Sequence, residues 1–170
     1  MHDPEAPWTL FDFADSAEAE AWTSIDDRVM GGISTSRLRH DPAGHAVFEG
    51  NVSLERNGGF ASVRSAPAAR GRAGAQTCTL EVRGDARRFK LNFLTEDAFD
   101  GLNYQTTFQP DPDRWQSLRI PLAEFRPTFR GREVLGASPL DHARLRQVGL
   151  MIAERQAGPF ALAIRRIGLA

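Results

Sequence analysis

Short segments in which apolar and polar residues alternate recur along almost the whole chain, with turn-forming residues between them. In residues 87–95, for example, Phe89, Leu91 and Phe93 occupy every second position. A period of two places successive side chains on opposite faces of a β-strand. About ten such segments, without any strand–helix–strand rhythm, predict an all-β fold. The expected architecture is an antiparallel jelly-roll β-sandwich.

The length of 170 residues suits one domain with its own hydrophobic core. We expect residues 8–170 to form that single domain, residues 1–7 to be a disordered tail, and residues 16–21 to form one short helix. Cys78 is the only cysteine, so no internal disulfide can form, and we interpret it as a buried core residue rather than a reactive thiol. The expected core contains Phe11, Phe48, Phe60, Leu80, Phe93, Leu118, Leu150, Ile152 and Ile164.

The near-neutral net charge argues against long-range electrostatic attraction of the whole molecule to a strongly charged partner. The 21 basic and 22 acidic side chains leave a formal net charge of −1, so we expect neither nucleic-acid binding nor membrane insertion. Residues 1–7 resemble neither a signal peptide nor a mitochondrial presequence, which favours a cytoplasmic location. The abundance of Ala, Arg, Gly and Pro favours a bacterial source.

Three short blocks are more specific than the strand pattern. They are Asp26-Asp27-Arg28-Val29-Met30-Gly31-Gly32-Ile33-Ser34, Asn57-Gly58-Gly59-Phe60 and Arg83-Gly84-Asp85. In this order the set resembles the complex I intermediate-associated protein 30 family, from about Trp8 to Gly168. The resemblance implies a galactose-binding-like jelly roll without catalytic activity. It also implies a role like that of the mitochondrial members, which assemble respiratory NADH:ubiquinone oxidoreductase. The chain departs from the family at Ala86-Arg87-Arg88-Phe89, where members more often carry Gly and Tyr.

The charged part of the first block has two interpretations. Asp26, Asp27 and Arg28 could form a recognition cluster, because the guanidinium group offers a planar set of donors. Alternatively, one of the carboxylates holds the following Gly-Gly turn by accepting backbone N–H bonds. The third block, Arg83-Gly84-Asp85, is predicted to be a tight hairpin between strands at residues 76–83 and 87–95.

A shallow polar groove on one sheet is the predicted ligand or partner site. Aromatic platforms and hydrogen-bonding side chains are expected to line it, from Trp22, Asp27, Arg28, Arg64, Asn92, Tyr104 and Trp115. Two alternatives stay open at this point. The tryptophans Trp22 and Trp115 could belong to the core, and Arg64 could form an internal ion pair.

Residues 125–139 are predicted to be a long loop, and the basic, aromatic part at 125–132 is a second candidate contact. Arg130 and Arg132 lie there beside two phenylalanines. Arg and aromatic residues carry much of the energy of protein interfaces, so this loop could dock a protein partner, or RNA. Alternatively, it is a solvated crossover with its phenylalanines tucked beneath it.

Neither a catalytic site nor a resident cofactor or metal is predicted. The acidic residues Glu96, Asp97 and Asp100 in one loop, and Asp111 and Asp113 in another, could hold Ca²⁺ but are more often solvated. The function expected is a non-catalytic, protein-binding assembly factor or chaperone-like domain, whose partners could be respiratory-complex subunits. The alternative is a module that binds a carbohydrate or another small polar ligand.

Overall fold

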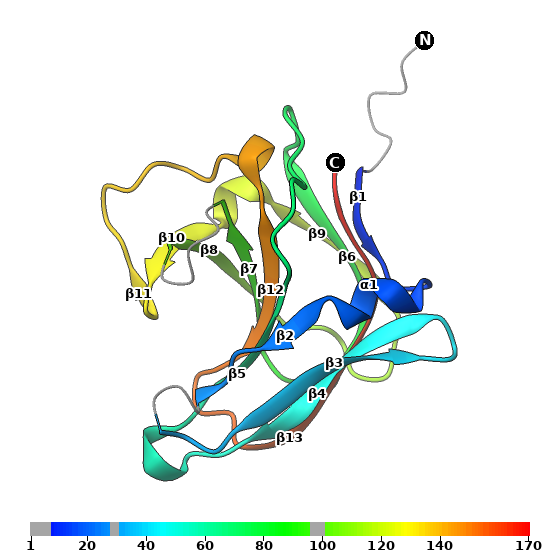
Figure 1. Cartoon of the computed structure of the whole chain (residues 1–170), viewed down its shortest axis with the longest axis vertical. Coiled ribbons are helices and arrows are strands. Elements are labelled where there is room, and N and C mark those ends of the chain that lie inside the picture. Colours follow the sequence, from blue (N-terminus) through cyan, green and yellow to red (C-terminus); the bar gives the residue numbers. More distant parts are fainter. Residues whose placement is uncertain (1–7, 28–30, 96–100) are drawn as a thin grey trace.

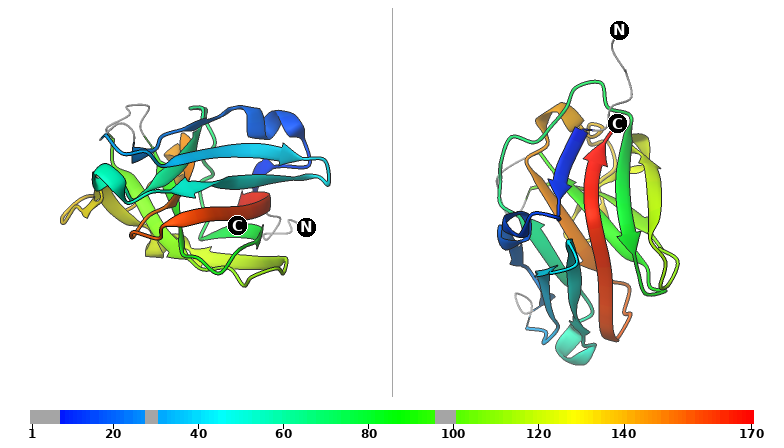
Figure 2. Two further views of the ribbon diagram at one scale, coloured as in Figure 1. Left: turned by 90° about the horizontal axis from the view of Figure 1, so that it is seen from below. Right: turned by 90° about the vertical axis from the view of Figure 1, so that its right-hand side faces the viewer.

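A computed structural model describes residues 8–27, 31–95 and 101–170. Within these residues the strands form two antiparallel sheets that pack face to face (Figures 1 and 2). Sheet A has the order β3-β4-β13-β6-β9, with β1 also paired to β13. Its strands are β1 (Trp8–Asp12), β3 (Thr35–Asp41), β4 (His45–Val52), β6 (Thr77–Arg83), β9 (Gln116–Pro121) and β13 (Gly158–Leu169).

Sheet B has the order β11-β10-β8-β7-β12-β5-β2. Its strands are β2 (Trp22–Ser24), β5 (Ala61–Ser65), β7 (Phe89–Leu94), β8 (Asn103–Phe108), β10 (Arg126–Phe129), β11 (Arg132–Glu133) and β12 (Gln147–Ile152). The predicted jelly-roll β-sandwich is therefore confirmed.

Helical segments are short in the described part of the chain. The helix α1 (Ser16–Glu20) begins as predicted, since the Asp15 carboxylate accepts a hydrogen bond from the backbone N–H of Ala17 at 3.0 Å. The 3₁₀ turns are η2 (Glu55–Asn57), η3 (Leu122–Glu124) and η4 (His142–Arg144).

The core lies between the inner faces of the two sheets. Phe48 from sheet A packs edge-to-face on Phe89 from sheet B, with ring centroids 6.2 Å apart, and also on Phe160. The predicted core residues are buried except Phe60 and Leu118, which are only partly buried. Cys78 is fully buried, and burial raises the pKa of its thiol, so the core interpretation of this cysteine is confirmed.

Two local predictions are wrong. The Arg83-Gly84-Asp85 block is not a hairpin, because β6 and β7 belong to different sheets and the block carries the chain from one to the other. A Cβ atom on Gly84 would lie 2.2 Å from the ring of Pro110, so this crossover needs glycine. The predicted loop at 125–139 contains the β10–β11 hairpin, whose turn residues Arg130 and Gly131 have φ angles of 50° and 78°.

Candidate binding surfaces

Two adjacent buried carboxylates connect the sheets just after β2. Asp26 accepts hydrogen bonds from the backbone N–H and hydroxyl of Ser36 in β3, and from the backbone N–H of Ser62 in β5 at 3.0 Å. Because β3 belongs to sheet A and β5 to sheet B, one carboxylate holds both sheets. We call Asp26, Asp27 and their hydrogen-bonding partners the carboxylate junction.

Asp27 brings the first two sequence blocks together. Its carboxylate accepts bonds from the backbone N–H of Ser34 at 2.9 Å, from the Ser34 hydroxyl, and from the backbone N–H of Gly59 at 2.8 Å. A Cβ atom on Gly32 would lie 2.4 Å from this carboxyl group, and one on Gly58 2.6 Å from it. These glycines are therefore required because the backbone passes directly against Asp27.

The two carboxyl groups of the junction differ in acidity. Burial raises the pKa of Asp26 more than its hydrogen bonds lower it. Burial acts in the same direction on Asp27, but the bonds donated by Ser34 and Gly59 outweigh it and lower its pKa. Since Asp27 is only 1% exposed, the structural interpretation holds, and the expectation that it contacts a partner is corrected. Arg28 lies outside the described residues.

A polar row crosses the outer face of sheet B. The strand register aligns one residue from each of six strands, in the order Thr23, Arg64, Gly149, Asn92, Gln105 and Arg126. Gly149 contributes no side chain to the row, and a Cβ atom placed on it would lie 3.5 Å from the Cβ of Asn92. Burial lowers the pKa of the Arg64 guanidinium. The structure thus brings together Arg64 and Asn92, two of the residues predicted for the groove.

Hydrogen bonds hold the side chains of this polar row in place. The side-chain amide of Gln105 donates to the side-chain oxygen Oδ1 of Asn92 at 2.8 Å, and Lys90 donates to the side-chain oxygen of Gln105 at 3.3 Å. Lys90 also lies 3.6 Å from the carboxylate of Glu154. The face therefore carries an ordered set of polar groups rather than independent side chains, but Asn92 is itself buried, at 4% exposure.

The expected aromatic platforms do not line this face. Trp22 is buried against Phe11 and Phe13, with ring centroids 5.0 and 6.0 Å away. Tyr104 is buried too, and its hydroxyl donates to the backbone carbonyl of Ser138 at 2.9 Å. The groove prediction is corrected for both residues, because strand alternation turns them toward the core. No strand position on this face, within the described residues, carries an aromatic ring.

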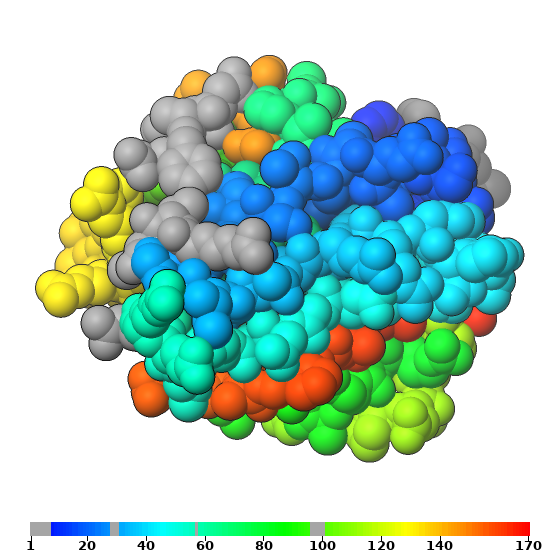
Figure 3. Space-filling view, turned by 60° about the horizontal axis from the view of Figure 1, so that its bottom comes forward, coloured from blue at the N-terminus to red at the C-terminus, as the bar shows by residue number. Residues whose placement is uncertain are grey.

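The β10–β11 hairpin lies at the edge of the same sheet. The two phenylalanines of the predicted basic, aromatic loop differ in burial. Phe125 is buried and stacks on Phe93 with centroids 4.6 Å apart, whereas Phe129 is 38% exposed. The Arg130 guanidinium lies 5.2 Å from the Phe129 ring centroid, and Arg132 is exposed beside it. In Figure 3 the hairpin, coloured yellow, projects from the molecule.

Trp115, also predicted for the groove, belongs to the outer face of sheet A instead. The guanidinium carbons of Arg165 and Arg83 lie 3.9 and 5.0 Å from its ring centroid, and the ring of His45 packs edge-on at 5.2 Å. We call these four residues the Trp115 cluster. Burial lowers the pKa of His45, and the nearby arginines lower it further. Among the described residues, no carboxylate pairs with Arg83 or Arg165.

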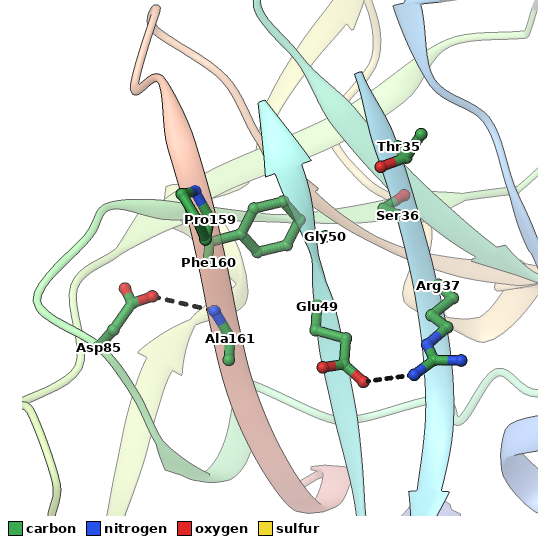
Figure 4. A pocket seen from close by; sticks show the side chains of 9 residues that line it. All are labelled: Thr35, Ser36, Arg37, Glu49, Gly50, Asp85, Pro159, Phe160 and Ala161. Carbon is green, nitrogen blue, oxygen red and sulfur yellow. Dashed lines mark hydrogen bonds and ion pairs between the residues drawn. The ribbon is translucent and has the colours of Figure 1, made fainter. Parts of the chain in front are cut away.

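A hollow of about 640 Å³ lies on the same face, over β3, β4 and β13 (Figure 4). Pro159, Phe160 and Ala161 of β13 form part of its lining. Its charged groups have partners within the chain: Glu49 accepts from Arg37 at 3.2 Å, and Asp85 accepts from the backbone N–H of Ala161 at 3.0 Å.

The remaining features concern the acidic loops and possible membrane-spanning segments. Asp111 pairs with Arg114, and the described residues contain no group of three or more His, Cys, Asp or Glu side chains arranged to hold a metal ion. Glu96, Asp97 and Asp100 lie outside those residues. Within the same limits, no helix is long and apolar enough to cross a membrane. The residues of the two surfaces that were not anticipated include His45, Arg83, Gln105 and Arg165.

Sequence comparison with known proteins finds mitochondrial relatives of this chain. Complex I intermediate-associated protein 30 from Drosophila melanogaster is 28% identical over 184 residues, and its counterpart from Neurospora crassa is 25% identical over 143. The alignments cover 94% and 74% of this chain, but only 62% and 51% of the two mitochondrial relatives. Both of these relatives are eukaryotic, so the bacterial source and the cytoplasmic location remain predictions.

Solved structures with a similar fold include carbohydrate-binding modules. A family 11 module from Clostridium thermocellum, solved with a β-1,3-1,4-mixed-linked tetrasaccharide, superposes with a TM-score of 0.71 at 16% identity. The match covers 96% of this chain and 94% of the module. The family model for complex I intermediate-associated protein 30 matches residues 11–164. This chain therefore belongs to the complex I intermediate-associated protein 30 family.

Proposed function

We propose that the chain is a non-catalytic protein-binding module that acts in the assembly of respiratory complex I. Family membership supports the class of function, because relatives of this chain carry that name. The observation that carries the proposal is the β10–β11 hairpin, which exposes Phe129 beside Arg130 and Arg132. Leu135, just after the hairpin, is 87% exposed. Exposed aromatic and aliphatic side chains beside arginines are typical of protein-binding surfaces.

The polar row on sheet B extends the proposed contact. Arg126 of β10 occupies one end of that row, so the row reaches the strand that carries Phe129, while strand alternation places Phe129 itself on the opposite face of β10. A contact with an apolar tip and a polar remainder suits a factor that must bind a partner and later release it.

Capture from the native host tests the proposal. The tagged full chain is expected to enrich complex I subunits, identified by mass spectrometry. The Arg130→Ala/Arg132→Ala double variant and the Phe129→Ser variant are expected to reduce that enrichment at least five-fold with unchanged folding, since these side chains are exposed. Arg144→Ala, another exposed arginine, is the matched control. Wild-type enrichment by both hairpin variants would remove the hairpin from the contact.

Carbohydrate binding is the alternative, favoured by the polar row and by the similar fold. The lack of an aromatic ring at the strand positions of that face weakens it, because sugar rings commonly pack against aromatic faces. A direct probe is the mixed-linked tetrasaccharide bound by the family 11 module. Saturable binding that is lost in Arg64→Ala and Asn92→Ala, but not in the hairpin variants, would favour this alternative.

A further inference from the structure

We propose that the Trp115 cluster is a second binding site, which takes a carboxylate from a short acidic segment of a protein partner. The cluster lies on sheet A, whereas the contact proposed above lies on sheet B, so the two proposals stand or fall separately.

Both guanidinium groups are positioned in a way that leaves their donors available. Arg165 and Arg83 lie over one indole ring, at 3.9 and 5.0 Å from its centroid. Stacking engages the face of a guanidinium group, whereas its N–H donors point outward from its edge. Trp115 is itself held by the edge-on ring of His45, which is 7% exposed. The cluster therefore presents two ordered, exposed cations with little rotamer entropy left to lose on binding.

The neighbouring arginines on this face behave differently. Arg39 pairs with Glu49 and Asp41, Arg37 pairs with Glu49, and Arg166 pairs with Asp12 at 3.2 Å. By contrast, the described residues supply no carboxylate partner to Arg83 or Arg165. Arg119 of β9 also has no carboxylate partner among the described residues, but it does not lie over an aromatic ring there. Within that part of the chain, Arg83 and Arg165 are unpaired arginines of this sheet that a ring holds in place, and they are available to a group from another molecule.

The surroundings select a peptide carboxylate over a nucleic-acid backbone. Asp41, Glu49, Glu81 and Asp85 lie at outward positions of sheet A or beside the hollow, and they would repel the closely spaced phosphates of a nucleic-acid backbone. A flexible acidic peptide can bring one or two carboxylates to the cluster and turn its other side chains away from these acids, which reduces the repulsion. The outward residues of β13 leading from the hollow to Arg165 are the small residues Ala161 and Ala163, of which Ala161 is exposed and Ala163 is buried.

Fluorescence anisotropy with defined probes tests the proposal. Fluorescein-labelled hexaglutamate is expected to bind the full chain saturably at low ionic strength, while hexaglutamine does not bind. The Arg83→Ala/Arg165→Ala double variant is expected to weaken hexaglutamate binding at least ten-fold. Arg83→Lys/Arg165→Lys keeps the charge without the planar fork, so an intermediate loss is expected.

Controls keep the outcome unambiguous. Arg144→Ala removes an exposed positive charge from η4, outside both sheets, and is expected to leave the affinity for hexaglutamate unchanged. Far-ultraviolet circular dichroism checks that each variant is folded. Wild-type affinity in the Arg83→Ala/Arg165→Ala variant, or no binding of hexaglutamate by the wild-type chain, overturns the proposal. Tighter binding of hexathymidylate than of hexaglutamate also overturns it and assigns the cluster to phosphate.

Discussion

The carboxylate junction and the Trp115 cluster place charged side chains in opposite situations. Asp26 and Asp27 are buried and accept several hydrogen bonds each from the chain itself. Arg83 and Arg165 are exposed, stacked on a ring, and have no carboxylate partner in the described part of the chain. Described residues of two of the three blocks that carry the family resemblance converge on the junction. The most specific sequence signal therefore marks how the sheets are joined, while the available donors lie elsewhere.

The largest expected effect is loss of stability at the junction. Asp27→Ala leaves the backbone N–H groups of Ser34 and Gly59 buried without acceptors. We expect it to lower the free energy of unfolding by about 3 kcal/mol, measured by urea denaturation. Asp111→Ala, at an exposed ion pair, is the control and should cost less than about 0.5 kcal/mol. An equal loss in the free energy of unfolding for the two variants would show that the junction carboxylate is no more important for stability than an exposed one.

The glycines around Asp27 provide the next test. Gly58→Ala places a methyl group 2.6 Å from the Asp27 carboxylate and 2.5 Å from the Ser53 carbonyl oxygen. We expect a loss of about 2 kcal/mol in the free energy of unfolding, because the backbone at Ser53 cannot easily move away from the added methyl group. Gly149→Ala is the matched control, since its added methyl group would meet its nearest neighbour at an ordinary 3.4 Å. A similar loss in both would show that crowding at Asp27 is not the cause.

The Trp115 cluster should matter less for stability. Trp115→Leu removes the ring over which Arg83 and Arg165 lie, and interactions of this kind contribute about 0.5–1 kcal/mol at exposed sites. We expect a decrease of about 1 kcal/mol in the free energy of unfolding, together with weaker hexaglutamate binding. A decrease as large as that of Asp27→Ala would make the cluster a structural element instead.

The smallest expected effect is a pH dependence from His45. Its folded pKa lies below the ordinary value of 6.5, through burial and the charges of Arg83, Arg165 and Arg39, with Asp41 opposing. The unfolded chain therefore binds more protons at mildly acidic pH, and stability falls as the pH drops below 6.5. We expect His45→Gln to flatten the decline in melting temperature between about pH 7.5 and about pH 5.5. An unchanged slope would exclude His45 as its source.

Local pattern was enough to predict the strands and much of the core. Alternation at Phe89, Leu91 and Phe93 identified β7 and its buried face, and the same argument placed Cys78 inside. Sheet membership was harder, because pairing depends on distant residues. Arg83-Gly84-Asp85 has the composition of a hairpin turn, yet Asp85 accepts a bond from Ala161 and the chain crosses between sheets there.

The candidate surfaces were predictable only in part. Arg64 and Asn92 do share a face, but Tyr104 lies on the opposite side of its strand, with the same parity as the buried Phe108. In a strand that alternates polar and aromatic residues, the sequence alone does not decide which of the two alternating sets of side chains faces the core. The Trp115 cluster could not be assembled from sequence, because its residues come from separate strands and only the register brings them together.

The position of β13 has a consequence for how the molecule folds. This strand comes last among the described strands, yet it pairs with β1, β4 and β6 at the centre of sheet A. During synthesis, β3 and β4 can pair early, and β7 can pair with β8, but sheet A stays divided until β13 has been made. Closing contacts so distant in sequence is slow, and the unfinished edges of β4 and β6 remain open to wrong partners in the meantime. A protein proposed to assist assembly would thus itself depend on protection while it is being made.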